Sequence, residues 1–116
     1  MHHIQVMEAS VRAGKMPEFV HAVQHWERLA LDDPDAPEYH AVYVGEADPH
    51  RLLVVTQFRD RATASRFTAA GLFDTFEEKV RHLLADVPQR TPFDLFYAAG
   101  SEGTNVIFGE DTSTPH

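Results

Sequence analysis

The sequence predicts an α+β fold of the ferredoxin-like βαββαβ type, with a four-stranded antiparallel sheet. Four stretches alternate between apolar and polar residues: one near the start, two in the middle and one near the end. A stretch with helical periodicity follows the first of them, and a second one precedes the last. With 116 residues in all, we expect one domain over residues 1–99 and a C-terminal tail over residues 100–116.

The first predicted strand is residues 3–11, HIQVMEASV, with apolar residues on both faces. Both faces are therefore expected to be buried. Pro17 suits the first turn of a helix, where its missing N–H is not needed. We expect this helix to run to about Leu31, because its apolar residues recur three and four apart, and the loop DDPDAP (32–37) to end it.

The second and third predicted strands are residues 38–45, EYHAVYVG, and residues 51–58, RLLVVTQF. The segment ADPH (47–50) between them predicts a hairpin connection. Asp60 is expected to cap a short helix that Gly71 ends.

The last helix and strand complete the predicted domain. Thr75 and Glu78 fit a capping box that opens a helix, and Pro88 is expected to stop it. Residues 91–98, TPFDLFYA, form the predicted last strand. In the polar tail, only residues 106–108 are apolar, and they are expected to dock on a neighbour or form a short strand, while the final residues fray.

The composition excludes several classes of function. The net charge of −8 disfavours binding to nucleic acid or to anionic membranes. The absence of cysteine excludes disulfides, thiolate metal sites and a cysteine nucleophile. The apolar runs are too short to span a bilayer, and the N-terminus lacks the pattern of a signal peptide. A cytoplasmic protein is therefore expected.

The predicted sheet carries apolar residues on both of its faces. In the second strand, Tyr39, Ala41 and Tyr43 lie on one side, and Val42 and Val44 on the other. Helices in this fold cover one face only. Because a large exposed apolar face is unusual in a monomer, we predict a homodimer packed sheet to sheet around an apolar interior.

The order of short motifs resembles a known family. Ala13-Gly14 precedes a helix start that reads Pro17-Glu18-Phe19, and EYHAVYV (38–44) forms a strand. LLVVTQFRDRATASRF (52–67) joins a strand, an aromatic residue, an acidic turn and an alanine-containing helix, before GLFDTF (71–76). Over residues 3–98, this order is similar to that of the antibiotic biosynthesis monooxygenase domains of the dimeric α/β-barrel superfamily.

The resemblance implies a dimeric oxygenase that uses O₂ and no metal or flavin, and that acts on small electron-rich aromatic molecules such as phenols and hydroquinones. Phe58 stands where the family usually has a Trp. The haem-degrading relatives have an Asn at the position of Met7 and a Trp at that of Phe58. Haem cleavage is therefore not expected.

His40 is the candidate general base, because it titrates near working pH and stands among apolar residues in a strand. Gln57 is the candidate group to orient a substrate oxygen in an apolar cavity. Ordinary packing of a strand explains both residues equally well. The cavity wall is expected to include Met7, Val42, Phe58 and Phe73.

Other polar residues have simpler interpretations. His21 and His25 lie four apart on the first helix, which suits a shared metal ion, but no third ligand is evident and we expect a solvated face and no metal. Asp94 is expected at an edge or paired with Arg90. Two other functions fit the same fold: a non-catalytic small-molecule-binding or interaction dimer, and a cofactor-free isomerase.

Overall fold

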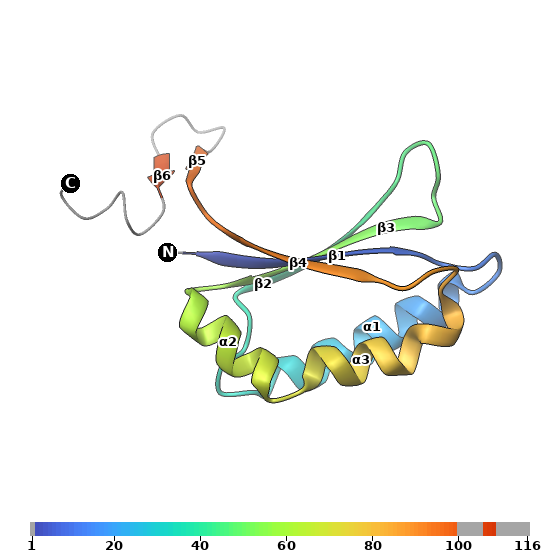
Figure 1. Ribbon diagram of the computed structural model, residues 1–116, viewed down its shortest axis with the longest axis horizontal. Helices are drawn as coiled ribbons and strands as arrows, with labels where there is room; N and C mark the ends of the chain where they lie inside the picture. Colours follow the sequence, from blue (N-terminus) through green and yellow to red (C-terminus); the bar gives the residue numbers. More distant parts are fainter. Residues whose placement is uncertain (1, 100–105, 109–116) are drawn as a thin grey trace.

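The computed structural model describes residues 2–99 and the backbone of residues 106–108. A four-stranded antiparallel sheet, in the order β2-β3-β1-β4, is covered by helices on one side and bare on the other (Figure 1). The ferredoxin-like prediction is confirmed. No helix in the described part of the chain has the length and apolar character needed to cross a membrane. The elements are β1 (His3–Ser10), α1 (Met16–Leu31), β2 (Tyr39–Val44), β3 (Arg51–Phe58), α2 (Arg61–Ala69), α3 (Leu72–Val80) and β4 (Gln89–Asp94).

The pairing register determines which side chains face the helices. Met7 of β1 lies opposite Val54 of β3 and Arg90 of β4, and Val54 lies opposite Val42 of β2. Paired residues point to the same side of a sheet, and neighbours along a strand point to opposite sides. The side toward the helices, here called the inner face, carries these residues: His3, Gln5, Met7, Ala9, His40, Val42, Val44, Leu52, Val54, Thr56, Phe58, Arg90, Pro92 and Asp94.

The core between the inner face and the helices is built largely from aromatic rings. The α1 stripe buries Phe19, Val23 and Trp26, as its periodicity predicts. The ring of Phe67 on α2 lies 5.1 Å from that of Phe58 and 5.2 Å from that of Phe73. Such offset and edge-to-face contacts add to the gain from burying the rings.

The second helical stretch differs from the prediction at both ends. α3 begins at Leu72, after Gly71 with φ of 90°, so Thr75 lies inside the helix and the capping-box prediction is wrong. A left-handed residue there lets the chain turn sharply between α2 and α3. α3 ends at Val80, and the 3₁₀ turn η1 (Arg81–Leu83) follows it. The extended Leu84 then forms a bridge with Val11.

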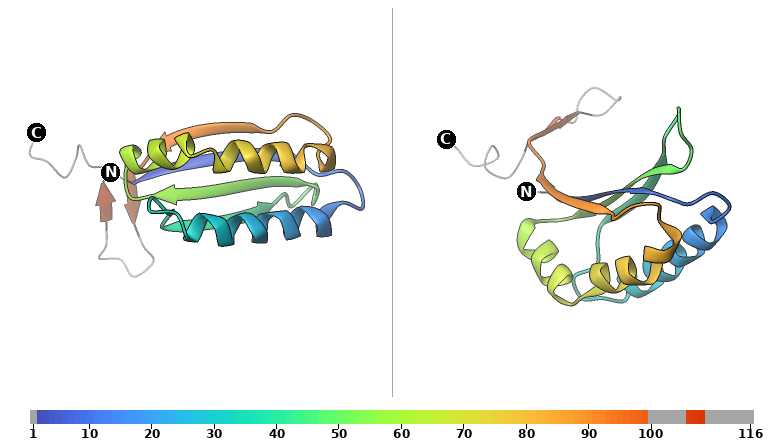
Figure 2. Two further views of the ribbon diagram at one scale, coloured as in Figure 1. Left: turned by 90° about the horizontal axis from the view of Figure 1, so that it is seen from below. Right: turned by 45° about the vertical axis from the view of Figure 1, so that its right-hand side comes forward.

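The last predicted strand is divided in two. β4 starts earlier than expected, at Gln89, and stops at Asp94. β5 (Tyr97–Ala99) then rises away from the sheet and pairs with β6 (Val106–Phe108), the short strand expected in the tail (Figures 1 and 2). Leu95 still donates its N–H to the carbonyl of His2, so the sheet ends there. The final tail residues lie outside the described ranges.

Replacing Phe67 with alanine is expected to destabilise the protein by about 3–5 kcal/mol, because this fully buried ring contacts Phe58, Phe73 and Trp26. Urea unfolding followed by circular dichroism measures the change. Val87→Ala, at a side chain that is 79% exposed, is the matched control and should alter the unfolding free energy by less than about 0.5 kcal/mol. Equal effects of the two substitutions would contradict this view of the core.

Candidate active site

His40 lies on the inner face of the edge strand β2, opposite Thr56 of β3. Its Nδ1 lies 3.1 Å from Oγ1 of Thr56. Its Nε2 is buried, forms no hydrogen bond and lies 3.9 Å from a carboxylate oxygen of Glu27. The ring stands 5.0 Å, centroid to centroid, from the indole of Trp26. Nδ1 of the imidazole is thus hydrogen-bonded, whereas Nε2 has no hydrogen-bond partner.

The surroundings of His40 favour its neutral form. Burial lowers the pKa of His40, and the nearby Glu27 carboxylate opposes this effect only in part. When Nδ1–H donates to Thr56, Nε2 carries a lone pair. A neutral imidazole with a free lone pair is the form that accepts a proton in general base catalysis.

A small cavity, here called the inner cavity, lies between the sheet and helices α1 and α3. Its volume is about 20 Å³, which is room for one or two molecules the size of water. Most of its walls are apolar. It is lined by Gln5, Met7, Val23, Trp26, His40, Val54, Thr56, Phe73, Phe76 and Arg90.

A larger groove of about 260 Å³, here called the outer groove, lies between the end of α1 and the start of β2. Trp26 and His40 line both spaces, so these two side chains form the wall between them. Glu27 lines the outer groove only, and its carboxylate lies 3.9 Å from Nε2 of His40. The groove is lined by Trp26, Glu27, Ala30, Leu31, Pro37, Glu38, Tyr39 and His40.

Arg90 on β4 supplies the only cationic side chain of the inner cavity. Its guanidinium lies 5.1 Å from the centre of the Phe73 ring. Nη2 lies 3.5 Å from a carboxylate oxygen of Asp74. Nη1 lies 3.5 Å from a carboxylate oxygen of Glu77, with which it forms an ion pair but no hydrogen bond. Within residues 2–99, Nη1 of Arg90 and Nε2 of His40 are the buried side-chain nitrogens or oxygens that lack a hydrogen bond.

A polar network continues from the cavity along the inner face. Nε2 of Gln5 lies 2.9 Å from Nε2 of the buried His3, whose Nδ1 lies 2.9 Å from Asp94. Arg61 also donates a hydrogen bond to Asp94. Both hydrogen bonds lower the pKa of the Asp94 carboxyl, and the one from Arg61 has the larger effect. Asp94 was expected at an edge or paired with Arg90, and the edge position is confirmed, because β4 is an edge strand. Its partners are Arg61 and His3, whereas Arg90 meets Asp74 of α3.

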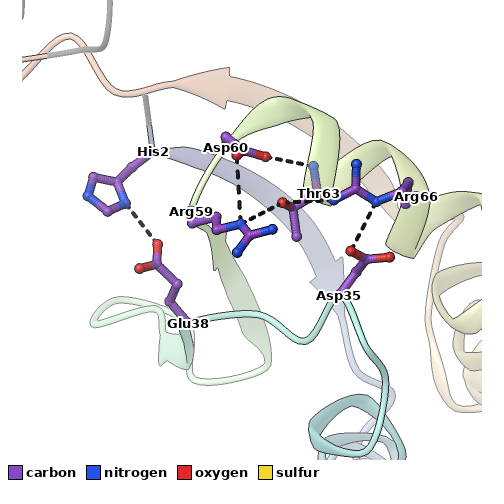
Figure 3. A network of polar contacts seen from close by, with 7 residues as sticks. All are labelled: His2, Asp35, Glu38, Arg59, Asp60, Thr63 and Arg66. Atoms are coloured by element: carbon purple, nitrogen blue, oxygen red, sulfur yellow. Dashed lines mark hydrogen bonds and ion pairs between the residues drawn. The ribbon is translucent and has the colours of Figure 1, made fainter.

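A second polar network holds the segment that borders the outer groove. Asp35 lies 3.0 Å from Arg66 of α2, and Glu38 lies 2.8 Å from His2 (Figure 3). Asp60 accepts a hydrogen bond from the backbone N–H of Thr63, which confirms the predicted cap of α2. Segment 32–38 is therefore tied to α2 and to the start of β1 by partly exposed polar contacts.

The predicted site residues separate into three groups. Met7 and Phe73 line the inner cavity together with His40. Gln57 lies on the opposite face of the sheet from His40, because its neighbour Thr56 faces inward. The structure therefore does not bring the two predicted polar groups together.

The other two predicted wall residues lie on the inner face but not at the cavity. Phe58 is fully buried in the aromatic core, and Val42, on the edge strand, is 40% exposed. Sequence reasoning missed Gln5, Trp26 and Arg90 as residues that line this cavity. The register is the signal for Gln5, because His40, Thr56 and Gln5 form one row across three strands.

No metal centre is evident in residues 2–99, where no group of three or more potential ligands is placed to hold an ion. His21 and His25 are exposed on α1. They border a surface groove that also contains Arg28 and Lys79, which disfavour a bound cation.

The fold is that of the antibiotic biosynthesis monooxygenase structures. A protein from Nitrosomonas europaea, described as a "putative antibiotic biosynthesis monooxygenase", matches with a TM-score of 0.70 and 17% identity over 85% of this chain and 94% of its own. A variant of SnoaB, a cofactor-independent oxygenase from Streptomyces nogalater, matches with a TM-score of 0.66 and 14% identity, over 79% of this chain and 90% of its own.

A conserved protein from Methanosarcina mazei, whose description states no activity, matches equally well, with a TM-score of 0.70 and 14% identity over 80% of this chain and 91% of its own. No protein-family sequence profile and no curated protein sequence matches this chain. At these identities the likeness shows the fold, and function has to be argued from the site.

The fluorescence of Trp26, the single tryptophan, is expected to report the protonation of His40. An imidazolium quenches a neighbouring indole more strongly than a neutral imidazole, so emission should fall as the pH is lowered. Because burial lowers the pKa of His40, the midpoint should lie below the ordinary value of about 6.5. His40→Gln should remove this step, and His21→Gln, at an exposed site, should leave it unchanged.

The same shift makes stability depend on pH. Unfolded chains take up a proton on His40 near pH 6.5, whereas the folded protein does so only at lower pH. The contribution of His40 to stability is therefore full above this pH and decreases as the pH falls through it. A midpoint of the fluorescence step above 6.5 would show that His40 is not held neutral.

Proposed function

We propose that this protein is a cofactor-independent monooxygenase that acts with O₂ on small electron-rich aromatic molecules of the phenol or hydroquinone type. The observation that carries the proposal is the buried Nε2 of His40, which has no hydrogen-bond partner and belongs to a ring whose pKa is lowered by burial. The fold shared with a cofactor-independent oxygenase supports the same reaction class.

In this proposal, His40 accepts the proton of a substrate hydroxyl that enters from the outer groove. The resulting phenolate is electron-rich enough to reduce O₂ without a metal or flavin. Trp26 supplies an aromatic surface in the groove for the substrate ring. Met7 and Phe73 exclude water from the inner side of the wall, which strengthens the polar contacts of His40.

We also propose a homodimer formed through the bare face of the sheet. Ile4, Val6 and Val55 occupy the centre of this face, and Tyr39 and Phe93, both about half exposed, lie toward its edges. A contiguous apolar surface of this kind is a common feature of subunit interfaces. Two copies related by a two-fold axis would bury it on both chains.

Oxygen consumption with a panel of substituted hydroquinones tests the reaction. Turnover by the wild-type protein without added metal or flavin is expected, and His40→Gln should lower kcat/KM by about 10²–10⁴-fold, the usual contribution of a general base. His21→Gln is the matched control on exposed α1 and should retain full activity. Unchanged turnover in His40→Gln would remove His40 from the mechanism.

A different outcome would favour the non-catalytic alternative. Aromatic molecules that quench Trp26 and saturate, without any oxygen consumption across the panel, would indicate a binding protein.

Val55→Glu tests the dimer, since Val55 is flanked by Val6 and Ala41 at the centre of the bare face. Light scattering should give twice the chain mass for the wild type at micromolar concentration and one chain mass for the variant, because a buried unpaired carboxylate opposes association. Val87→Glu, at an exposed site, should remain dimeric. A wild-type monomer would refute the dimer directly.

A further inference from the structure

A third space, here called the α2–β4 groove, lies between helix α2 and the end of strand β4. Its volume of about 570 Å³ is more than twice that of the outer groove and lies within the range of about 300–1,000 Å³ that is usual for small-molecule sites. His40 is not among the residues that line it. Its walls include His3, Gln5 and Asp94 from the sheet and Arg61, Ser65 and Ala69 from α2.

The sheet side of this groove holds a carboxylate–imidazole pair. His3 is only 5% exposed, and its Nδ1 lies 2.9 Å from a carboxylate oxygen of Asp94. The hydrogen bonds from Arg61 and His3 lower the pKa of Asp94, so its carboxylate is ionised and can only accept. His3 therefore carries its hydrogen on Nδ1, and Nε2 of the neutral ring has the lone pair. A carboxylate fixes the tautomer of a general base in this way.

Nε2 of His3 is covered by a side chain that can move aside. Nε2 of Gln5 lies 2.9 Å away and donates to the lone pair of the neutral ring. Gln5 is only partly buried, and its amide stands at the end of three rotatable bonds. A ligand hydroxyl can therefore replace the amide at Nε2 of His3, and the displaced amide can donate to the ligand oxygen.

The charges and the walls of the groove define the class of ligand. Arg61 and Asp94 are the charged residues among those that line it, and they form an ion pair with each other. The groove therefore offers no net charge to an ionic ligand. Ala64, Ala69 and Pro92 supply apolar parts of its walls. These features favour an uncharged, mostly apolar molecule whose hydroxyl is acidic enough to give its proton to an imidazole, as in a phenol or an enol.

We propose that the α2–β4 groove is a second small-molecule site, in which an uncharged phenol or enol binds through its hydroxyl to Nε2 of His3. The hydroxyl proton moves to Nε2, and the ligand oxygen keeps the bonding electron pair. The resulting imidazolium lies between the Asp94 carboxylate and the ligand anion, which both stabilise it. No electron is transferred, so the step needs no oxidant. The site is separate from His40 and does not depend on the oxygenase activity proposed above.

The absorbance of 4-nitrophenol tests the site, because its phenolate absorbs visible light and its neutral form does not. At a pH about one unit below the pKa of the free phenol, about a tenth of it is ionised. Wild-type protein should raise the phenolate absorbance several-fold to saturation, because an adjacent imidazolium stabilises the anion. His3→Gln should lose the increase that His40→Gln retains.

The opposite pattern would overturn the proposal. An increase that persists in His3→Gln and disappears in His40→Gln would place the phenol beside His40, as the proposed oxygenase requires, and not in the α2–β4 groove. No increase with the wild-type protein would contradict the site as well. Oxygen consumption without a signal that depends on His3 would leave the oxygenase function intact, so the two proposals fail separately.

A substitution on the helix side tests the groove without touching His3. Ser65 and Ala62 are both exposed on α2, but only Ser65 lines the groove. Ser65→Trp should fill it and raise the Kd of 4-nitrophenol about tenfold or more, whereas Ala62→Trp, the matched control, should leave the Kd unchanged. Urea unfolding checks that each variant folds. Equal affinity of folded Ser65→Trp and the wild type would overturn the site, even if His3→Gln fails to fold.

Discussion

The pairing of β2 with β3 is the constraint on which the candidate site depends. It places His40 opposite Thr56, so the imidazole faces the helices and finds a hydroxyl partner. A shift of one residue would turn His40 to the bare face and bring an apolar Ala41 or the large Tyr39 inward. Because β2 is an edge strand with one neighbour, its register is set by pairing with β3 alone.

The strands and the first helix follow from local sequence, whereas their ends depend on tertiary contacts. β3 matches its predicted range of residues 51–58 because its run of apolar and β-branched residues is bounded by a turn on each side. α3 starts at Leu72 rather than Thr75, since Phe73 and Phe76 reach the core only if the helix has already begun. β4 stops at Asp94 because Asp94 pairs with His3, the first residue of its partner strand β1. The local sequence of β4 does not reveal where this partner begins.

The sequence predicted one residue of the candidate site but not the residues around it. His40 stands out in the sequence as a titratable residue within an apolar strand, and the structure places it, partly buried, at a cavity. Gln57 was grouped with it by nearness in sequence, but consecutive residues of a strand point to opposite faces. Arg90 and Gln5 come from other strands, and only the pairing of β1 with both neighbours shows that they belong with His40.

Pro92 on the edge strand β4 has a consequence for assembly. A proline has no N–H to offer to an additional strand, so this border of the sheet cannot be extended continuously at that point. A polymer in which β2 of one molecule adds to β4 of the next requires both borders and is thereby interrupted. The fold thus favours closed association over open-ended fibres, which protects a chain with a large bare apolar surface while it is newly made and still dilute.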